Sequence, residues 1–252
     1  MKDELLRLGL SLGEAMMQAG AEVYRVEDTL ARLLQKTGAE EVQVIATPTG
    51  IYLSVTLQGE VHTAVKRIGR GSIDLSKVCE LNALSRSVAA GAYPSDVLRD
   101  VKTILTRPPE YAKWQQSLLV AVAGGAFALL FGGGVVEAFA GAVGALLVQV
   151  ICAGLGTLGT NRFLVDFAGG GTAALSALLL NLAISHKTDL AIIGAIMTLV
   201  PGLLLTNAIR DALSGNLLSG TSRLLEAFFV SISIAGGVGA VLSLWRSLGG
   251  LI

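Results

Sequence analysis

Long apolar stretches in the second half of the chain are the strongest constraint on its fold. A helix needs about 20 predominantly apolar residues to cross a bilayer. Five stretches reach this length with one charged residue at most, and they are residues 117–136, 138–160, 163–185, 190–209 and 227–245. In a water-soluble bundle, five helices that are apolar on every side would have almost nothing to face water. We therefore expect an all-α membrane domain of about five transmembrane helices in a lipid bilayer.

Charged residues are concentrated at the other end of the chain. Residues 1–113 hold 28 of the 38 Lys, Arg, Asp and Glu side chains, whereas 22 of the 31 glycines lie after residue 113. This division predicts a polar domain over residues 1–112 and a membrane domain over residues 113–252. Basic and acidic residues balance within the polar part, which indicates no nucleic-acid-binding surface.

The basic residues also predict an orientation in the membrane. Loops that are rich in Lys and Arg tend to stay on the cytoplasmic side. With five spans, one side receives Arg99, Lys102, Arg107, Lys113, Arg162, Arg210 and Arg223, and the other receives Lys187 and Arg246. We expect the N-terminal domain to be cytoplasmic and the C-terminus to lie outside.

The polar domain has the pattern of an α+β fold. Apolar residues recur at helical spacing over 3–19, 22–37, 74–91 and about 95–105. Between the second and third of these stretches, the segments 42–46, 51–58 and 61–68 are β-branched and partly alternating, and Gly59 suits a tight turn. We expect helices packed on a small antiparallel sheet. In the membrane half, small residues four apart, such as Ser233 and Gly237, favour close helix packing.

The fourth apolar stretch contains a feature that breaks helices. Pro201 lacks a backbone N–H and disfavours helical geometry at Val200, and Gly202 lowers helix stability further. A half-helix that begins near Pro201 would point its free N–H groups toward the middle of the membrane, where they would suit a carboxylate. A simple packing kink is the alternative explanation.

Polar residues follow this break. Asn207 and Asp211 lie four residues apart on one helical face, with Arg210 beside them. Asp166 precedes a run of three glycines in the third apolar stretch, and interrupted spans close to acidic groups are typical of transport sites. Asn207, Asp211 and the later Arg223 are candidates for substrate binding, and Asp166 and Asp211 are candidates for ion coupling. Asp166 could instead lie at the cytoplasmic end of its helix and face the headgroups.

Motifs for catalysis, cofactors or metals are absent from the sequence. It has no GxSxG, Walker A, CxxC or HExxH pattern, and its two cysteines, Cys79 and Cys152, are far apart. We therefore expect no cofactor, no metal site and no enzymatic activity. His62 in a strand is a weak candidate for catalysis.

Several segments resemble the bacterial threonine/serine exporter family, in the split form in which a long subunit pairs with a shorter membrane subunit. The resemblance covers nearly the whole chain and rests on GAEVYRVEDTL (20–30), TPTGIYLSV (47–55), DLSKVCELNALSRSVAAG (74–91) and LVPGLLLTNAIRDALSGNLLSGTSRLLEA (199–227). It implies a multi-pass protein of the bacterial cytoplasmic (inner) membrane and a homo- or hetero-oligomer. The residues that match the family's membrane motif are Pro201, Gly202, Asn207, Asp211, Gly215, Gly220 and Arg223, and those that match its cytoplasmic motif are Glu27, Pro48 and Gly50.

The resemblance implies ion-driven export of small carboxylate-bearing metabolites, either threonine and serine or a C4 dicarboxylate such as succinate. We expect the half-helix at Pro201-Gly202 to bind the substrate carboxylate, Arg223 to pair with Asp211, and the cytoplasmic motif to act in gating. Two alternatives remain. One is a membrane-anchored hydrolase with catalysis in the cytoplasmic domain, and the other is a passive channel.

Overall fold

The computed structural model of the chain describes residues 2–69, 71, 73–89, 94–108, 110–184 and 187–249. The expected end of the third span, Ser185, lies outside them. The chain divides into two compact units, one made of Met1–Pro108 and Leu203–Leu224 and the other of Pro109–Gly202 and Leu225–Ile252. The first unit thus combines the N-terminal part of the chain with a segment from the second half.

A three-stranded antiparallel sheet forms one layer of the first unit. Its strands lie in the order β1 (Glu41–Thr47), β2 (Gly50–Leu57) and β3 (Glu60–Arg67). The turn between β2 and β3 places Gln58 and Gly59 at φ angles of 55° and 74°, a conformation that glycine adopts without strain. The predicted antiparallel sheet and its tight turn are confirmed.

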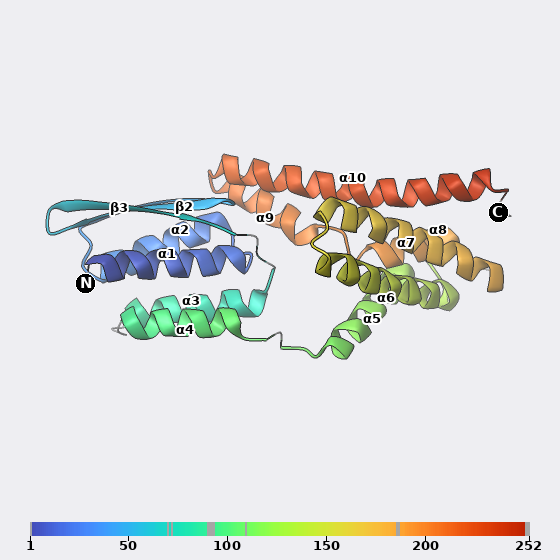
Figure 1. The fold of residues 1–252 in the computed structure, drawn as a ribbon, viewed down its shortest axis with the longest axis horizontal. Helices are drawn as coiled ribbons and strands as arrows, with labels where there is room; N and C mark the ends of the chain where they lie inside the picture. The colour runs from blue at the N-terminus through green and yellow to red at the C-terminus, as the bar shows by residue number, and fades with distance from the viewer. Residues whose placement is uncertain are drawn as a thin grey trace. The chain divides into compact units, whose positions relative to one another are not determined.

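Four helices complete this α+β part. They are α1 (Lys2–Gln18), α2 (Val23–Lys36), α3 (Leu75–Ala89) and α4 (Pro94–Thr106). In Figure 1, α1 and α2 lie between the sheet and the α3–α4 pair. The buried core joins α1, α2 and β2 through residues such as Leu12, Leu30 and Leu53. Helical and strand periodicity therefore identified the elements and their inward faces.

The segment from the second half joins the first unit through α9 (Gly202–Leu213) and the first turns of α10 (Leu217–Ser247). Gly215, at φ 92°, lies in the turn between the two helices. Gly220 lets α10 approach α9 closely, since a Cβ atom there would lie 2.8 Å from the carbonyl oxygen of Ala208. The two helices form a hairpin that packs as part of the first unit.

The second unit is helical. It contains α5 (Lys113–Leu130), α6 (Val135–Thr157), α7 (Arg162–Ala183), α8 (Thr188–Ile196) and the rest of α10. Among the described residues, three helices are long and apolar enough to cross a membrane, and these are α6, α7 and α10. The protein is therefore a multi-helix membrane protein whose second unit carries the apolar helices.

Of the five expected spans, three correspond to such helices among the described residues, and the other two are not confirmed. The stretch 190–209 is divided between α8 and α9, since the helix stops at Ile196 and resumes at Gly202, after Pro201. The stretch 117–136 corresponds to α5, which begins with the polar residues KWQQ and ends at Leu130 before three glycines. Hydropathy averaged over a window of sequence does not register where a helix stops.

Glycines set the closest helix contacts in the second unit. A Cβ atom on Gly237 of α10 would overlap the carbonyl oxygen of Phe167 in α7. Gly124 of α5 and Gly141 of α6 face each other in the same way, because a Cβ atom on either would lie within 3.0 Å of the other's carbonyl oxygen. Such close backbone approach is the main packing device between helices in lipid.

We predict that Gly237→Ala destabilises the protein by about 1–3 kcal/mol, the usual cost of overpacking a close contact. Gly239→Ala in the same helix is the matched control, because a Cβ atom there meets nothing within 4 Å. Thermal unfolding of the purified variants in one detergent measures both effects. Equal melting temperatures for the two variants would contradict the close approach of α7 and α10.

Candidate functional site

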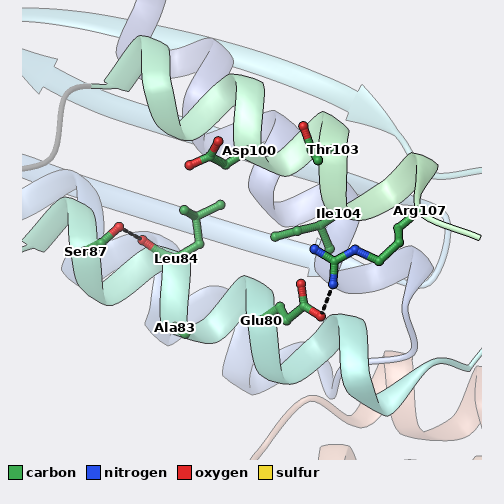
Figure 2. Close-up of a pocket in the computed structure, with 8 residues that line it drawn as sticks. All are labelled: Glu80, Ala83, Leu84, Ser87, Asp100, Thr103, Ile104 and Arg107. Atoms are coloured by element: carbon green, nitrogen blue, oxygen red, sulfur yellow. Dashed lines mark hydrogen bonds and ion pairs between the residues drawn. The ribbon is translucent and has the colours of Figure 1, made fainter. Parts of the chain in front are cut away.

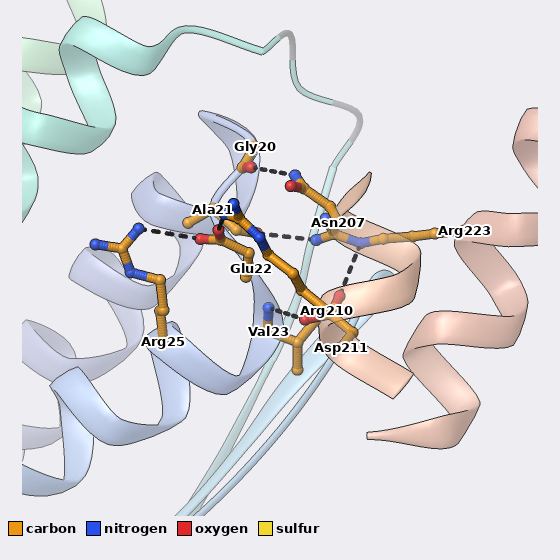
Figure 3. Close-up of polar contacts among 9 residues, drawn as sticks. All are labelled: Gly20, Ala21, Glu22, Val23, Arg25, Asn207, Arg210, Asp211 and Arg223. Atoms are coloured by element: carbon orange, nitrogen blue, oxygen red, sulfur yellow. Dashed lines mark hydrogen bonds and ion pairs between the residues drawn. The ribbon is translucent and has the colours of Figure 1, made fainter. Parts of the chain in front are cut away.

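The predicted site residues of α9 and α10 meet the loop between α1 and α2. Four consecutive loop residues, Gly20 to Val23, are each bound by a side chain from the 207–223 segment. Figure 3 shows these side chains converging on the start of α2. We call this contact the clasp, and it comprises residues 20–23 together with Asn207, Arg210, Asp211 and Arg223. All of its members belong to the first unit.

Two side chains of the clasp bind backbone carbonyl groups of the loop. The amide of Asn207 donates a hydrogen bond to the oxygen of Gly20 at 3.1 Å. The guanidinium of Arg223 donates through Nη2 to the oxygen of Ala21 at 2.9 Å. Arg223 is only 7% exposed, so its charge is almost completely removed from water. A buried arginine requires both a partner charge and saturated donors.

Asp211 supplies the partner charge and also caps α2. Its Oδ1 accepts a hydrogen bond from the backbone N–H of Val23 at 2.9 Å, and its Oδ2 lies 3.4 Å from Nε of Arg223. The residue at the N-cap of α2, Glu22, makes no side-chain capping bond. The first amide of α2 is therefore satisfied by a carboxylate 188 residues away, where the helix dipole also favours negative charge.

Glu22 forms the outer part of the clasp. Its carboxylate accepts hydrogen bonds from Arg210 at 2.8 Å and from Arg25 at 3.2 Å. Burial alone would raise the pKa of Glu22. Hydrogen bonds from its own backbone amide and from the two arginines outweigh burial and hold the pKa below its usual value. At neutral pH, Glu22 is therefore a stable anion that draws Arg210 toward the loop.

A second contact lies beside the clasp, at the edge of the sheet. Glu27 of α2 accepts a hydrogen bond from the backbone N–H of Ala46 through Oε1 and another from the amide of Asn216 through Oε2, at 2.8 and 3.0 Å. The hydroxyl of Ser219 donates to the oxygen of Ala46 at 3.5 Å. Both backbone groups of this edge residue are thus bound, which protects an otherwise open strand edge.

The other predicted residues lie elsewhere. Pro201 and Gly202 mark the break between α8 and α9, and Pro48 and Gly50 form and follow the turn between β1 and β2. Asp166 belongs to the second unit, in the second turn of α7. There its Oδ2 lies 3.8 Å from Nε of Arg162, which also binds Glu226 at 3.1 Å.

Sequence reasoning did not single out Glu22, Asn216 or Ser219, although it named Glu27 as a residue of the family's cytoplasmic motif. The only sign of Glu22 and the loop was their place in the GAEVYRVEDTL segment. The backbone groups of Gly20, Ala21 and Val23 have no side-chain signature that a sequence could show.

A separate hollow of about 400 Å³ lies between α3 and α4. Figure 2 shows Leu84 and Ile104 along it and the ion pair of Arg107 with Glu80, 2.7 Å long, at one end. Neither the clasp nor Asp166 contributes to its lining. Among the described residues, no group of three His, Cys, Asp or Glu side chains could hold a metal ion.

Residues 7–245 match the family described as "Putative threonine/serine exporter" (ThrE). The chain belongs to this exporter family. The match spans both units and includes every residue of the clasp. The resemblance inferred from the sequence motifs is confirmed, and the family is one of membrane transporters.

The individual relatives of the chain are of two kinds, which differ in length. The chain is 25% identical over 247 residues to the "Threonine/serine exporter" of Corynebacterium glutamicum and 26% identical over 238 residues to the "Probable threonine/serine exporter" of Mycobacterium tuberculosis, covering 93% of the chain in each case. It spans about half the length of these two proteins, 50% and 45% respectively.

The second kind of relative is aligned with the chain over nearly its whole length. The "Probable succinate transporter subunit YjjP" of Escherichia coli is 26% identical over 249 residues, which cover 95% of the chain and 94% of that protein. No solved structure matches the chain.

We predict that Arg223→Ala destabilises the protein by about 3–5 kcal/mol, because it leaves the buried carboxylate of Asp211 without a compensating charge. Arg32→Ala is the control, since its pair with Asp28 is exposed and should contribute about 1 kcal/mol at most. Chemical denaturation of the two variants provides the comparison. A loss for Arg223→Ala as small as that of the control would show that the clasp contributes little to stability.

The two clasp carboxylates, Glu22 and Asp211, should change the stability of the protein in opposite directions as the pH falls. The lowered pKa of Glu22 gives stability that is present above its unfolded value of about 4.5 and is lost as the pH falls through its folded value. Burial raises the pKa of Asp211 despite Arg223 and the helix amides, so ionisation of Asp211 lowers stability as the pH rises. We predict that Glu22→Gln flattens the acid dependence of stability between pH 3 and 6, whereas Asp211→Asn steepens it. Thermal unfolding across this range tests both signs.

Proposed function

We propose that the chain is the large subunit of a secondary active exporter of small carboxylate-bearing metabolites. The observation that carries the proposal is the match of residues 7–245 to the exporter family. The names of its relatives give threonine, serine and succinate, and the chemical group common to these three compounds is a carboxylate. The substrate is therefore a small amino acid of the threonine/serine type or a C4 dicarboxylate.

The lengths of the relatives support a second, smaller membrane subunit. The chain aligns with half of each amino-acid exporter but with nearly the whole of YjjP, whose name describes it as a subunit. In this proposal, the remaining half of the long exporters corresponds to a separate chain that assembles with this one in the bacterial inner membrane. The excess of Lys and Arg before the first apolar helix supports a cytoplasmic N-terminus.

Asp166 is the proposed ion-coupling residue in the membrane. It lies inside the candidate span α7 and is 8% exposed, and its only described charge partner, Arg162, is 3.8 Å away. Its Oδ2 accepts no hydrogen bond from the residues that the structure describes. A charge at the centre of a span costs roughly 2.5–3.5 kcal/mol on insertion scales, and less toward the ends of the span. Such a cost favours a functional role, here the binding and release of a proton.

Substrate handling is assigned to the segment that follows Pro201. Asp211 and Arg223 are buried and Asn207 is half-buried, and all three lie in or next to a family-matched helix that follows a break at Pro201-Gly202. Glu27 and the Pro48–Gly50 turn act in gating, since Glu27 connects the end of β1 to Asn216. The clasp contains these three substrate-handling residues and lies beside the gate.

Reconstituted transport provides the test. Liposomes that contain the chain and its co-purified membrane subunit are expected to accumulate serine, threonine or succinate when a proton gradient is applied, and to stop when an ionophore collapses the gradient. We predict that Asp166→Asn reduces gradient-driven transport at least tenfold. Asp189→Asn, an exposed acid at the start of α8, should behave like the wild type.

Each other outcome has a defined meaning. Flux that ignores the gradient would identify a passive channel, and hydrolysis of a substrate by the purified protein would identify an enzyme. Normal coupling in the Asp166→Asn variant would remove Asp166 from the mechanism. Purification of the chain from its native membrane without a second membrane protein would contradict the two-subunit assembly.

A further inference from the structure

The start of α2 has the chemistry of a carboxylate-binding site. The N–H groups of a helix N-terminus and the helix dipole favour an anion, and α2 is 14 residues long. Arg223 lies beside them, with 7% of the residue exposed and its guanidinium donating a hydrogen bond to the oxygen of Ala21. A helix N-terminus together with a fixed guanidinium is a combination that proteins use to bind carboxylate ligands.

The carboxylate at this site belongs to the protein itself, and it accepts fewer hydrogen bonds than a carboxylate can. Asp211 is completely buried, yet only its Oδ1 accepts a hydrogen bond from Val23. Its Oδ2 accepts none within the described part of the chain and lies 3.4 Å from Nε of Arg223. Burial raises the pKa of Asp211 above its usual value. The anion is therefore stabilised less well than a carboxylate with both oxygens bonded would be.

Two exposed guanidinium groups lie on the solvent side of the clasp. The side chains of Arg25 and Arg210, which both bind Glu22, are 46% and 58% exposed, so they can be reached from solvent. An anion that approaches the clasp is attracted to it before any internal contact breaks.

We propose that Asp211 is an internal competitor for the carboxylate of the transported metabolite, and that the metabolite opens the clasp by replacing Asp211 at Val23 and Arg223. This inference rests on the proposed function in one respect, namely that the substrate carries a carboxylate. The ligand class is a small mono- or dicarboxylate. Displacement removes one of the three contacts that hold α9 to the α1–α2 loop, so substrate binding and loosening of α9 become a single event.

This proposal predicts a gain of affinity that other roles do not. An internal competitor reduces the apparent affinity of a ligand by the fraction of molecules in which the site is free. Removing it should tighten binding. If Asp211 were only a structural cap, Asp211→Ala would bind no carboxylate, and if Asp211 were a direct ligand of the substrate, the same change would weaken binding.

The experiment is calorimetric titration of the full-length protein, purified in detergent, with succinate, L-serine and the uncharged analogue succinamide. We expect Asp211→Ala to bind succinate or serine at least tenfold more tightly than the wild type, and Asp211→Ala/Arg223→Ala to bind neither. Succinamide should bind to none of the variants. Asp28→Ala, which removes an exposed carboxylate from the same helix, should bind as the wild type does. Unchanged or weaker binding by Asp211→Ala would overturn the proposal.

A second measurement keeps the proposal testable if Asp211→Ala does not fold. Hydrogen exchange of the wild type with and without succinate or serine should show faster exchange in α9, as it leaves the loop, and no loss of protection at the start of α2, where the ligand replaces Asp211. Unchanged or slower exchange in α9 would refute displacement. Gradient-driven transport without the tighter binding or the faster exchange would reject only the role of Asp211 as a competitor. Absence of gradient-driven transport would reject the proposed function, and the binding result would still hold.

Discussion

The carboxylate of Asp211 at the start of α2 is the interaction on which the arrangement of the first unit depends. It joins residues that are 188 positions apart and caps a helix whose own N-cap residue makes no side-chain capping bond. Because Asp211 and Arg223 are both buried, neither charge can leave its partner without a large cost in free energy. This buried pair joins the 203–224 segment to the start of α2.

The clasp also has a direct connection to the apolar helices along the chain. α10 runs from Leu217 to Ser247 as one helix, so Arg223 in the first unit and Glu226 in the second are one turn apart. Glu226 in turn binds Arg162, which lies beside Asp166. Asp211 thus pairs with Arg223 of α10. Asp166 lies beside Arg162, which in turn binds Glu226 of α10.

Local patterns in the sequence were sufficient for most of the secondary structure. Alternating segments joined by a glycine turn predicted β2 and β3. Apolar residues at helical spacing within each helix predicted the inward faces of α1, which carries Leu12, and of α2, which carries Leu30. Counting apolar residues predicted five spans, of which three are supported among the described residues, because the length of an apolar stretch does not show where its helix ends. Pro201 and the glycines after Leu130 stop helices inside stretches of sufficient hydropathy.

The sequence by itself determined the family, the membrane character and the unusual residues Asn207, Asp211 and Arg223, since polar groups in an apolar context are costly and therefore conspicuous. Only the tertiary structure decided what these residues touch. Their partners are mainly backbone groups, the oxygens of Gly20 and Ala21 and the N–H of Val23. Every residue has a backbone N–H or carbonyl, so no pattern of side chains can reveal which of them a distant residue will bind. That choice is made by the fold, which brings a loop and a helix hairpin together at a helix N-terminus.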